Sequence, residues 1–187
     1  QGWTESTLTR EQVTGGVSAL GGASRIGEFI TELAAARDDG TFDWSRFDND
    51  GPDGIPNSGD DDGFVDVLGV LHPTNGAECG GDDRDSRIWS HRWSLRSATG
   101  QPYTTSTPSA NGGLIRINDY TIQPARNCSD TRINDIGVFA HELGHGFGLP
   151  DLYAVRGDHS GIGRWGLMGS GSYGCAGGEE ERPCFPG

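Results

Sequence analysis

The stretch HELGHGFGLPD, from His141 to Asp151, constrains this chain more than any other feature. If it is helical as far as Gly148, His141 and His145 lie at i and i+4 on one face, where two imidazole nitrogens can bind one divalent metal ion. Zinc prefers such nitrogen ligands. Gly148 allows a left-handed turn that returns Asp151 towards the ion as a third ligand. Three protein ligands leave a fourth position for water, which is the pattern of a catalytic zinc site.

Three more residues fit the chemistry of such a site. Glu142 points off the metal axis and is predicted to be the general base that acts on a water molecule. Met168 is the only methionine and lies in the glycine-rich stretch GIGRWGLMGSGSY. A single methionine usually fills a core, but after an extended zinc motif it is predicted to form a Met-turn beneath the metal. By analogy with metzincin peptidases, Tyr173 is a candidate transition-state stabiliser, with simple packing as the alternative.

The segments IGVFAHELGHGFGLPDLY, GIGRWGLM, FDNDG and DGFVD resemble the immune inhibitor A family of secreted bacterial metallopeptidases, over roughly residues 44–173. The resemblance implies a metzincin-like α/β fold with a twisted mixed sheet, an active-site helix and an irregular lower subdomain that contains the Met-turn. It also implies catalytic zinc, protein or peptide substrates, secretion, and a propeptide removed before Gln1. The zinc ligands would be His141, His145 and Asp151, the last in place of the third histidine of many metzincins.

A crowded acidic segment precedes the first predicted strand. Its oxygens follow an order like that of a calcium loop, with Gly63 at the sharp turn. An insertion at residues 51–61 interrupts the register, and a hydrated acidic loop is the alternative. The candidate calcium ligands are Asp48, Asp50, Asp60, Asp62, the carbonyl of Phe64, and Asp66.

Composition narrows the class of protein. A chain of 187 residues predicts one domain over 1–187, with an upper part at about 1–148 and a lower part at about 149–187. The net charge of −13 argues against nucleic acid and anionic membranes as partners. No apolar run is long enough to cross a bilayer, so membrane insertion is not expected. The chain is expected to be a monomer.

Four cysteines occur and no two form a CxxC pair, so a thiolate metal site is not expected. Two disulfides are predicted instead. Of the three possible pairings, Cys79–Cys128 and Cys175–Cys184 are favoured, because the second pair closes a short glycine-rich loop.

Hydrophobic periodicity predicts helices and strands between irregular segments. Residues 1–23 and the polar segment after residue 95 are predicted to be irregular. The active-site helix should begin between Ser129 and Asn134, with a core stripe of Ile136, Phe139, Ala140 and Leu143. An edge strand is predicted to pair with extended substrate, with the last strand beside it. The predicted elements are a helix at 24–40 and strands at 64–72, 88–95 (the edge strand) and 113–122.

Two other classes of protein remain open. In one, a zinc peptidase takes its third ligand from Glu179, Glu180 or Glu181, although the tail that holds them has no helical period. In the other, a catalytically silent calcium- or carbohydrate-binding module retains a metal site. The presence of Glu142 speaks against a silent module, since a binding protein needs no base there. The remaining histidines, His72, His91 and His159, are expected to be structural or exposed.

Overall fold

A computed structural model describes residues 3–155 and 157–174 of the chain. By their contacts these residues form two compact units. The first holds the described residues as far as Val70 together with Trp93–Tyr120, and the second holds Leu71–Arg92 and the described residues from Thr121 onward. The single domain 1–187 with its lower part from 149 stays a prediction. None of the described helices is both long and apolar enough to cross a membrane.

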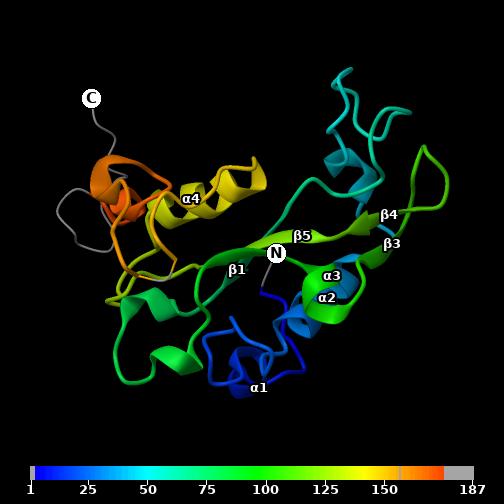
Figure 1. Cartoon of the computed structure of the whole chain (residues 1–187). Helices are drawn as coiled ribbons and strands as arrows, with labels where there is room; N and C mark the ends of the chain where they lie inside the picture. Colours follow the sequence, from blue (N-terminus) through cyan, green and yellow to red (C-terminus); the bar gives the residue numbers. More distant parts are fainter. Residues whose placement is uncertain (1–2, 156, 175–187) are drawn as a thin grey trace. The chain divides into compact units, whose positions relative to one another are not determined.

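Helix α2 (Ile26–Arg37) is the predicted first helix, and it buries Ile30 and Ala34 in the core of the first unit (Figure 1). The helix ends before Gly40, with Asp38 as its C-cap residue, and the Asp38 carboxylate binds residues outside the helix. That carboxylate accepts hydrogen bonds from the backbone N–H and hydroxyl of Ser106 and from the hydroxyl of Tyr103. These bonds fix the helix end beside strand β3 (Tyr103–Pro108).

Strand β3 pairs antiparallel with β4 (Leu114–Ile117) in a two-stranded sheet. The prediction of one strand over 113–122 was wrong, because Asn118 divides it into β4 and β5 (Asp119–Pro124). The Asn118 carbonyl accepts from the Leu95 N–H, and its side-chain oxygen accepts from the Arg96 N–H. These bonds turn the chain, so that β4 and β5 belong to different sheets.

The second sheet has the strand order β1-β5-β2, with β1 at Leu68–His72 and β2 at His91–Ser94. The expected neighbours are therefore found, since β2 lies at an edge with β5 beside it. Strand β1 begins later than predicted, because the chain before it pairs elsewhere. The Val65 N–H donates to the Arg116 carbonyl at 2.9 Å, and the Arg116 N–H donates to the Gly63 carbonyl at 3.0 Å.

Three short elements lie where irregular chain was predicted: α1 (Arg10–Thr14), α3 (Leu95–Thr99) and β3. Thr9 and Gln12 form a capping box at the start of α1. Strand β3 is a run of threonine and serine between two prolines. Single turns of 3₁₀-helix complete the regular structure, at η1 (Trp44–Phe47), η2 (Ala77–Cys79), η3 (Arg84–Ser86), η4 (Gly163–Trp165) and η5 (Ser170–Tyr173).

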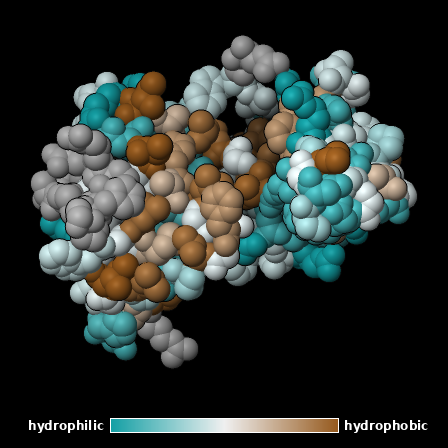
Figure 2. Space-filling model, turned by 90° about the horizontal axis from the view of Figure 1, so that it is seen from above, coloured by the Kyte–Doolittle hydropathy of each residue, from teal (hydrophilic) through white to brown (hydrophobic). Residues whose placement is uncertain are grey.

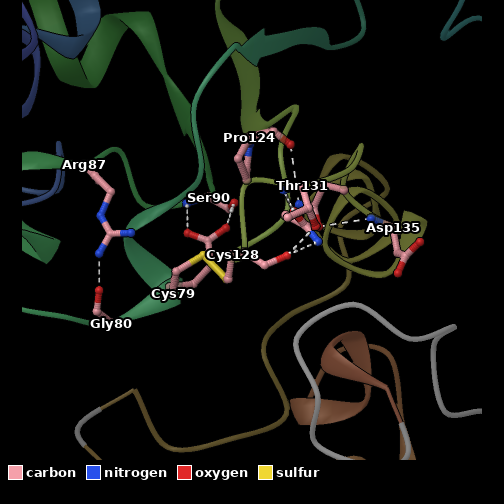
Figure 3. The surroundings of a disulfide bond; sticks show 12 residues. Cys79, Gly80, Arg87, Ser90, Pro124, Cys128, Thr131 and Asp135 are labelled. Atoms are coloured by element: carbon pink, nitrogen blue, oxygen red, sulfur yellow. Dashed lines mark hydrogen bonds between the residues drawn. A yellow bond between two sulfur atoms is a disulfide. The ribbon is translucent and has the colours of Figure 1, made fainter.

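The predicted disulfide between Cys79 and Cys128 is present in the second unit, with the two Cα atoms 5.2 Å apart (Figure 3). It joins η2 to the loop that precedes the active-site helix. Cys175, Cys184 and the alternative ligands Glu179, Glu180 and Glu181 lie outside the described residues.

Helix α4 (Ile136–Gly146) carries the histidines, and it begins slightly later than predicted, after Asp135 as N-cap. The predicted core stripe was wrong, since Ile136 is 66% exposed and Leu143 is 42% exposed. The buried residues are instead Gly137, Val138, His141, Glu142 and Gly144. Phe147, at 78% exposed, is a further exposed apolar side chain of this segment. Figure 2 shows that apolar residues, coloured brown, reach the surface on the face that it presents.

Candidate metal centre

Two glycines let α4 pack closely against the segment that follows the metal motif. A Cβ at Gly137 would overlap the backbone carbonyl of Ser172, and a Cβ at Gly144 would lie 2.7 Å from the Sδ of Met168. Because these positions lack side chains, η5 and the turn around Met168 lie directly against the helix. His141 and Glu142 are buried on the same helix, at 7% and 6% exposed.

The predicted zinc ligands converge on one point. The Oδ1 atom of Asp151 lies 3.2 Å from Nε2 of His141 and 3.4 Å from Nε2 of His145. Two ligands bound tetrahedrally to zinc at about 2.0–2.1 Å are themselves about 3.3 Å apart. These two separations match the spacing between ligands of a tetrahedral zinc site.

The second ring nitrogen of each histidine is fixed by a backbone carbonyl. Nδ1 of His141 lies 2.8 Å from the Leu167 oxygen, and Nδ1 of His145 lies 2.7 Å from the Leu149 oxygen. A carbonyl can only accept, so each Nδ1 carries the proton and each Nε2 of a neutral ring presents a lone pair. With the buried Oδ1 of Asp151, which has no hydrogen-bond partner, three acceptors face one another. Only a cation among them would make this arrangement favourable.

The return of Asp151 follows from the predicted left-handed turn, with Gly148 at φ +82°. Next to it, the Leu149 N–H donates to the Gly144 carbonyl, and the Leu152 N–H donates to the Met168 carbonyl. The last bond ties the segment that holds Asp151 to the turn around Met168. Met168 is buried, at 6% exposed, and its role as a Met-turn stays a prediction.

Glu142 lies beside these ligands as a second carboxylate. It groups with His141 and His145 within 4.8 Å, yet only Asp151 approaches both Nε2 atoms at zinc-ligand spacing. Burial first, and then the charges of the nearby carboxylates of Glu78 and Asp151, raise the pKa of Glu142 to about 8, against a hydrogen bond from the Arg92 backbone. A carboxyl with such a pKa can both take up and release a proton near neutral pH.

Two tyrosines stand near the centre. Tyr173, the candidate from the sequence, is half-buried, and burial and the charge of Glu78 raise its pKa. Tyr153 was not predicted. Its ring stacks beside that of His141 with centroids 6.5 Å apart, and burial, the charge of Asp151 and a hydrogen bond with that carboxylate raise its pKa to about 12. Its place two residues after Asp151 was the only signal in the sequence.

Glu78 was also missed by sequence reasoning, and no local pattern could have identified it. It comes from η2, far from the HELGH motif in sequence, and its charge acts on both Glu142 and Tyr173. Of the other histidines, His72 contacts the Thr74 hydroxyl and His91 contacts the Trp89 carbonyl. His159 is exposed.

The acidic segment of the first unit forms a separate cluster. Carboxylate oxygens of Asp48, Asp50 and Asp66 lie within 4.8 Å of one another. Asp48 is 1% exposed, and neither of its oxygens has a partner in hydrogen-bonding geometry. Burial, then the charge of Asp61, raises the Asp48 pKa to about 6, although the Gly63 backbone N–H opposes this shift.

Of the remaining calcium candidates, Asp62 lies beside the cluster, since its N–H donates to Asp50 at 3.2 Å. Its own carboxylate accepts from the Phe64 N–H at 2.8 Å. The structure directs Asp60 elsewhere, because that carboxylate binds the Ser58 hydroxyl and the Asp53 N–H.

Comparison with known proteins identifies the family of this chain. The family described as "Immune inhibitor A peptidase M6, catalytic domain" matches residues 14–187. Immune inhibitor A of Bacillus thuringiensis subsp. alesti is 34% identical over 152 residues, which cover 75% of this chain and 20% of that protein. The pre-pro-metalloprotease PrtV of Vibrio cholerae serotype O1 is 32% identical over 152 residues, which cover 79% of this chain and 16% of that protein. The chain thus spans a fifth or less of the length of these relatives. It belongs to the immune inhibitor A (M6) family of metallopeptidases.

Proposed function

We propose that this domain is a zinc-dependent endopeptidase that hydrolyses peptide bonds of proteins. The observation that carries the proposal is the position of the Asp151 Oδ1 atom, which lies from the Nε2 atoms of both His141 and His145 at the spacing of tetrahedral zinc ligands. Both histidines have their other nitrogen held by a carbonyl, which is the usual orientation of zinc-binding imidazoles.

His141, His145 and Asp151 would hold the zinc ion, which when bound would supply Lewis acidity to a water molecule and to the scissile carbonyl. Glu142 takes the proton from the attacking water and passes it to the leaving amine. Its burial suits both steps, because its pKa of about 8 lies near neutral pH. The carboxylate of Asp151 places a negative charge among the ligands, so more of the work falls on Glu142 than in a three-histidine site. Tyr173 and Tyr153 are the candidates to stabilise the developing oxyanion.

The decisive experiment replaces Glu142 with alanine and measures hydrolysis of casein together with the zinc content. We expect zinc to remain and the rate to fall by about 10²–10⁴-fold, because only the proton shuttle is lost. Glu28→Ala, at an exposed site on α2, is the control and should cleave as the wild type does. A Glu142→Ala protein with more than a tenth of wild-type kcat would refute the role of Glu142.

The alternative of a silent binding module predicts no cleavage by the wild type in the same assay. The Glu142 carboxyl favours the interpretation as an enzyme. A buried acid with a raised pKa is unfavourable for folding stability, but it is useful for proton transfer. The third-ligand glutamates of the tail remain a separate alternative for the metal, which the Asp151 prediction below addresses. Action outside the cell, release from an N-terminal propeptide, a monomeric state and the single domain 1–187 belong to the same proposal.

Calcium binding by the acidic segment is the second part of the proposal. A buried carboxylate without a hydrogen-bond partner is unfavourable unless a cation accompanies it, and Asp48 is such a group. Asp50 and Asp66 supply further hard oxygens, and Asp62 lies next to them. Calcium takes 6–8 oxygen ligands, and no histidine or cysteine lies in the segment. The ion would stabilise the first unit and take no part in the chemistry.

A further inference from the structure

The strand before the metal centre presents its outer edge to two carboxylates. In β2 and the residues beside it, the Leu95 N–H donates to the carbonyl of Asn118, which directly precedes β5. Alternate N–H groups of a strand point to opposite edges, so the N–H groups of Ser90 and Arg92 point the other way. The first donates to Glu78 at 3.4 Å, and the second is close enough to Glu142 to lower the pKa of that carboxyl as a hydrogen-bond donor.

The Glu78 side chain is held firmly in its position. Its Oε1 accepts from the Ser90 hydroxyl at 2.5 Å and its Oε2 from the Ser90 N–H at 3.4 Å; these are the dashed lines at Ser90 in Figure 3. A Cβ at Gly76 would overlap this carboxylate, so the glycine makes room for it. The next residue, Cys79, is joined to Cys128. The Glu78 end of the contact is therefore anchored in the second unit.

We propose that Glu78 is a positioning residue for the peptidase reaction: by binding Ser90 it fixes the outer edge of β2, so that the Arg92 N–H meets the carboxylate of Glu142. The inference rests on the proposed function, since it concerns the same base. It assigns Glu78 no contact with substrate or metal. It also means that the donors of Ser90 and Arg92 are occupied, so extended substrate would pair with this edge only beyond them.

The energetic cost of placing the Glu78 carboxylate near Glu142 supports a positioning role for Glu78. The charge of Glu78 repels Glu142 and burial disfavours its ionised form, so a second carboxylate here is unfavourable by itself. The two hydrogen bonds to Ser90 offset part of that cost. A displacement of the base by about 1 Å can lower a rate by about 10²-fold. Loss of the Glu78 contact should therefore appear in kcat more than in binding.

The test compares Glu78→Ala, Glu78→Gln and Ser90→Ala with the wild type, using one peptide substrate and measuring kcat, KM and zinc content. We expect Glu78→Ala to lower kcat about 10–100-fold, with KM within about threefold and zinc retained, as for residues that orient a catalytic group through another. Glu78→Gln keeps an acceptor oxygen and should recover most of the rate. Ser90→Ala should lose less than Glu78→Ala, and Ser86→Ala, in η3, is the control.

The double variant Glu78→Ala/Ser90→Ala should be no slower than Glu78→Ala alone, because both changes break one contact. Additive losses would overturn the proposal, as would a Glu78→Ala enzyme with more than a third of wild-type kcat. A change confined to KM, or a Glu78→Gln enzyme as slow as Glu78→Ala, would overturn it too. If Glu78→Ala does not fold, the milder Ser90→Ala decides alone: unchanged kcat refutes the role. A wild type that cleaves nothing refutes the proposed function instead.

Discussion

At the scale of single residues, Asp151 has the most demanding position. Its Oδ1 is buried among two imidazole lone pairs and has no hydrogen-bond donor. The charge of this carboxylate is acceptable only when a cation lies among the three atoms. The metal and the fold of the turn after α4 should therefore depend on each other.

Replacing Asp151 by alanine should weaken zinc binding at least 10-fold, since one of three protein ligands is lost. The measurement is zinc content after dialysis against a graded series of chelator concentrations. Asp158→Ala is the matched control, because that carboxylate is exposed and lies 3.9 Å from the exposed His159. Full zinc occupancy in Asp151→Ala would contradict the three-ligand site and favour a glutamate of the tail.

Some residues of the candidate site were predicted from the sequence and others were not. The two groups differ in how the fold brings them together. His141, Glu142, His145 and Asp151 share one helix and one glycine turn, so local geometry alone determines their convergence. Glu78 reaches Glu142 only through tertiary structure, and an isolated glutamate in an irregular loop has no pattern that marks it. The sequence therefore identifies the site residues that are close together in the chain, and it misses the one that only tertiary structure brings near.

At the scale of elements, α4 shows why helical period does not identify the buried face. The apolar residues at 136, 139, 140 and 143 have the correct spacing, yet Ile136 and Leu143 are exposed. Burial follows the glycines, because only Gly137 and Gly144 admit the backbone of η5 and the side chain of Met168. In the same way, the hydrophobic pattern alone predicted one strand where the structure has β4 and β5. The hydrogen bonds of Asn118 separate these two strands.

Gly137→Ala should destabilise the domain and lower activity, although alanine favours a helix interior by about 1 kcal/mol over glycine. The added Cβ would overlap a backbone carbonyl at Ser172, which cannot move aside without displacing η5. Gly144→Ala meets the flexible side chain of Met168 and should cost less. Chemical denaturation of both variants measures the order. A Gly137→Ala protein more stable than the wild type would refute this packing.

The acidic segment gives a prediction about pH. The folded-state pKa of Asp48 is raised, from 3.8 to about 6. Between these values the folded chain holds a proton that the unfolded chain has released, so without calcium stability falls as the pH rises through this range. Calcium replaces the proton. We therefore expect its stabilisation to be larger near pH 7 than near pH 5.

Thermal melting of the zinc-loaded protein with and without millimolar calcium, at both pH values, tests this. At ~100 times the dissociation constant the added stability is about 2.7 kcal/mol. Asp66→Ala should abolish the calcium-dependent shift, whereas Asp60→Ala should retain it, because Asp60 binds Ser58 and the Asp53 N–H instead. If the wild type melts at the same temperature with and without calcium, the site does not bind the ion.

At the scale of the whole molecule, composition predicted the class of protein better than its architecture. With 33% hydrophobic residues and 32 glycines, much of the chain must be loop, and cross-links become important for stability. A part of the net charge of −13 comes from the acidic segment, where a divalent cation would partly neutralise it. The division into two compact units left no signal in the sequence, since each unit is built from separate stretches of chain.

The Cys79–Cys128 disulfide should therefore contribute strongly to stability. Its two cysteines are 49 residues apart, and a loop of that length corresponds to about 4 kcal/mol in the chain-entropy model. Replacing both by serine should lower the melting temperature by well over the error of the measurement. It should also lower kcat, because η2 carries Glu78 next to the bridge. Ser86→Ala serves again as the control in the same stretch of chain. Four free thiols in the unfolded, unreduced protein would show that no disulfide forms.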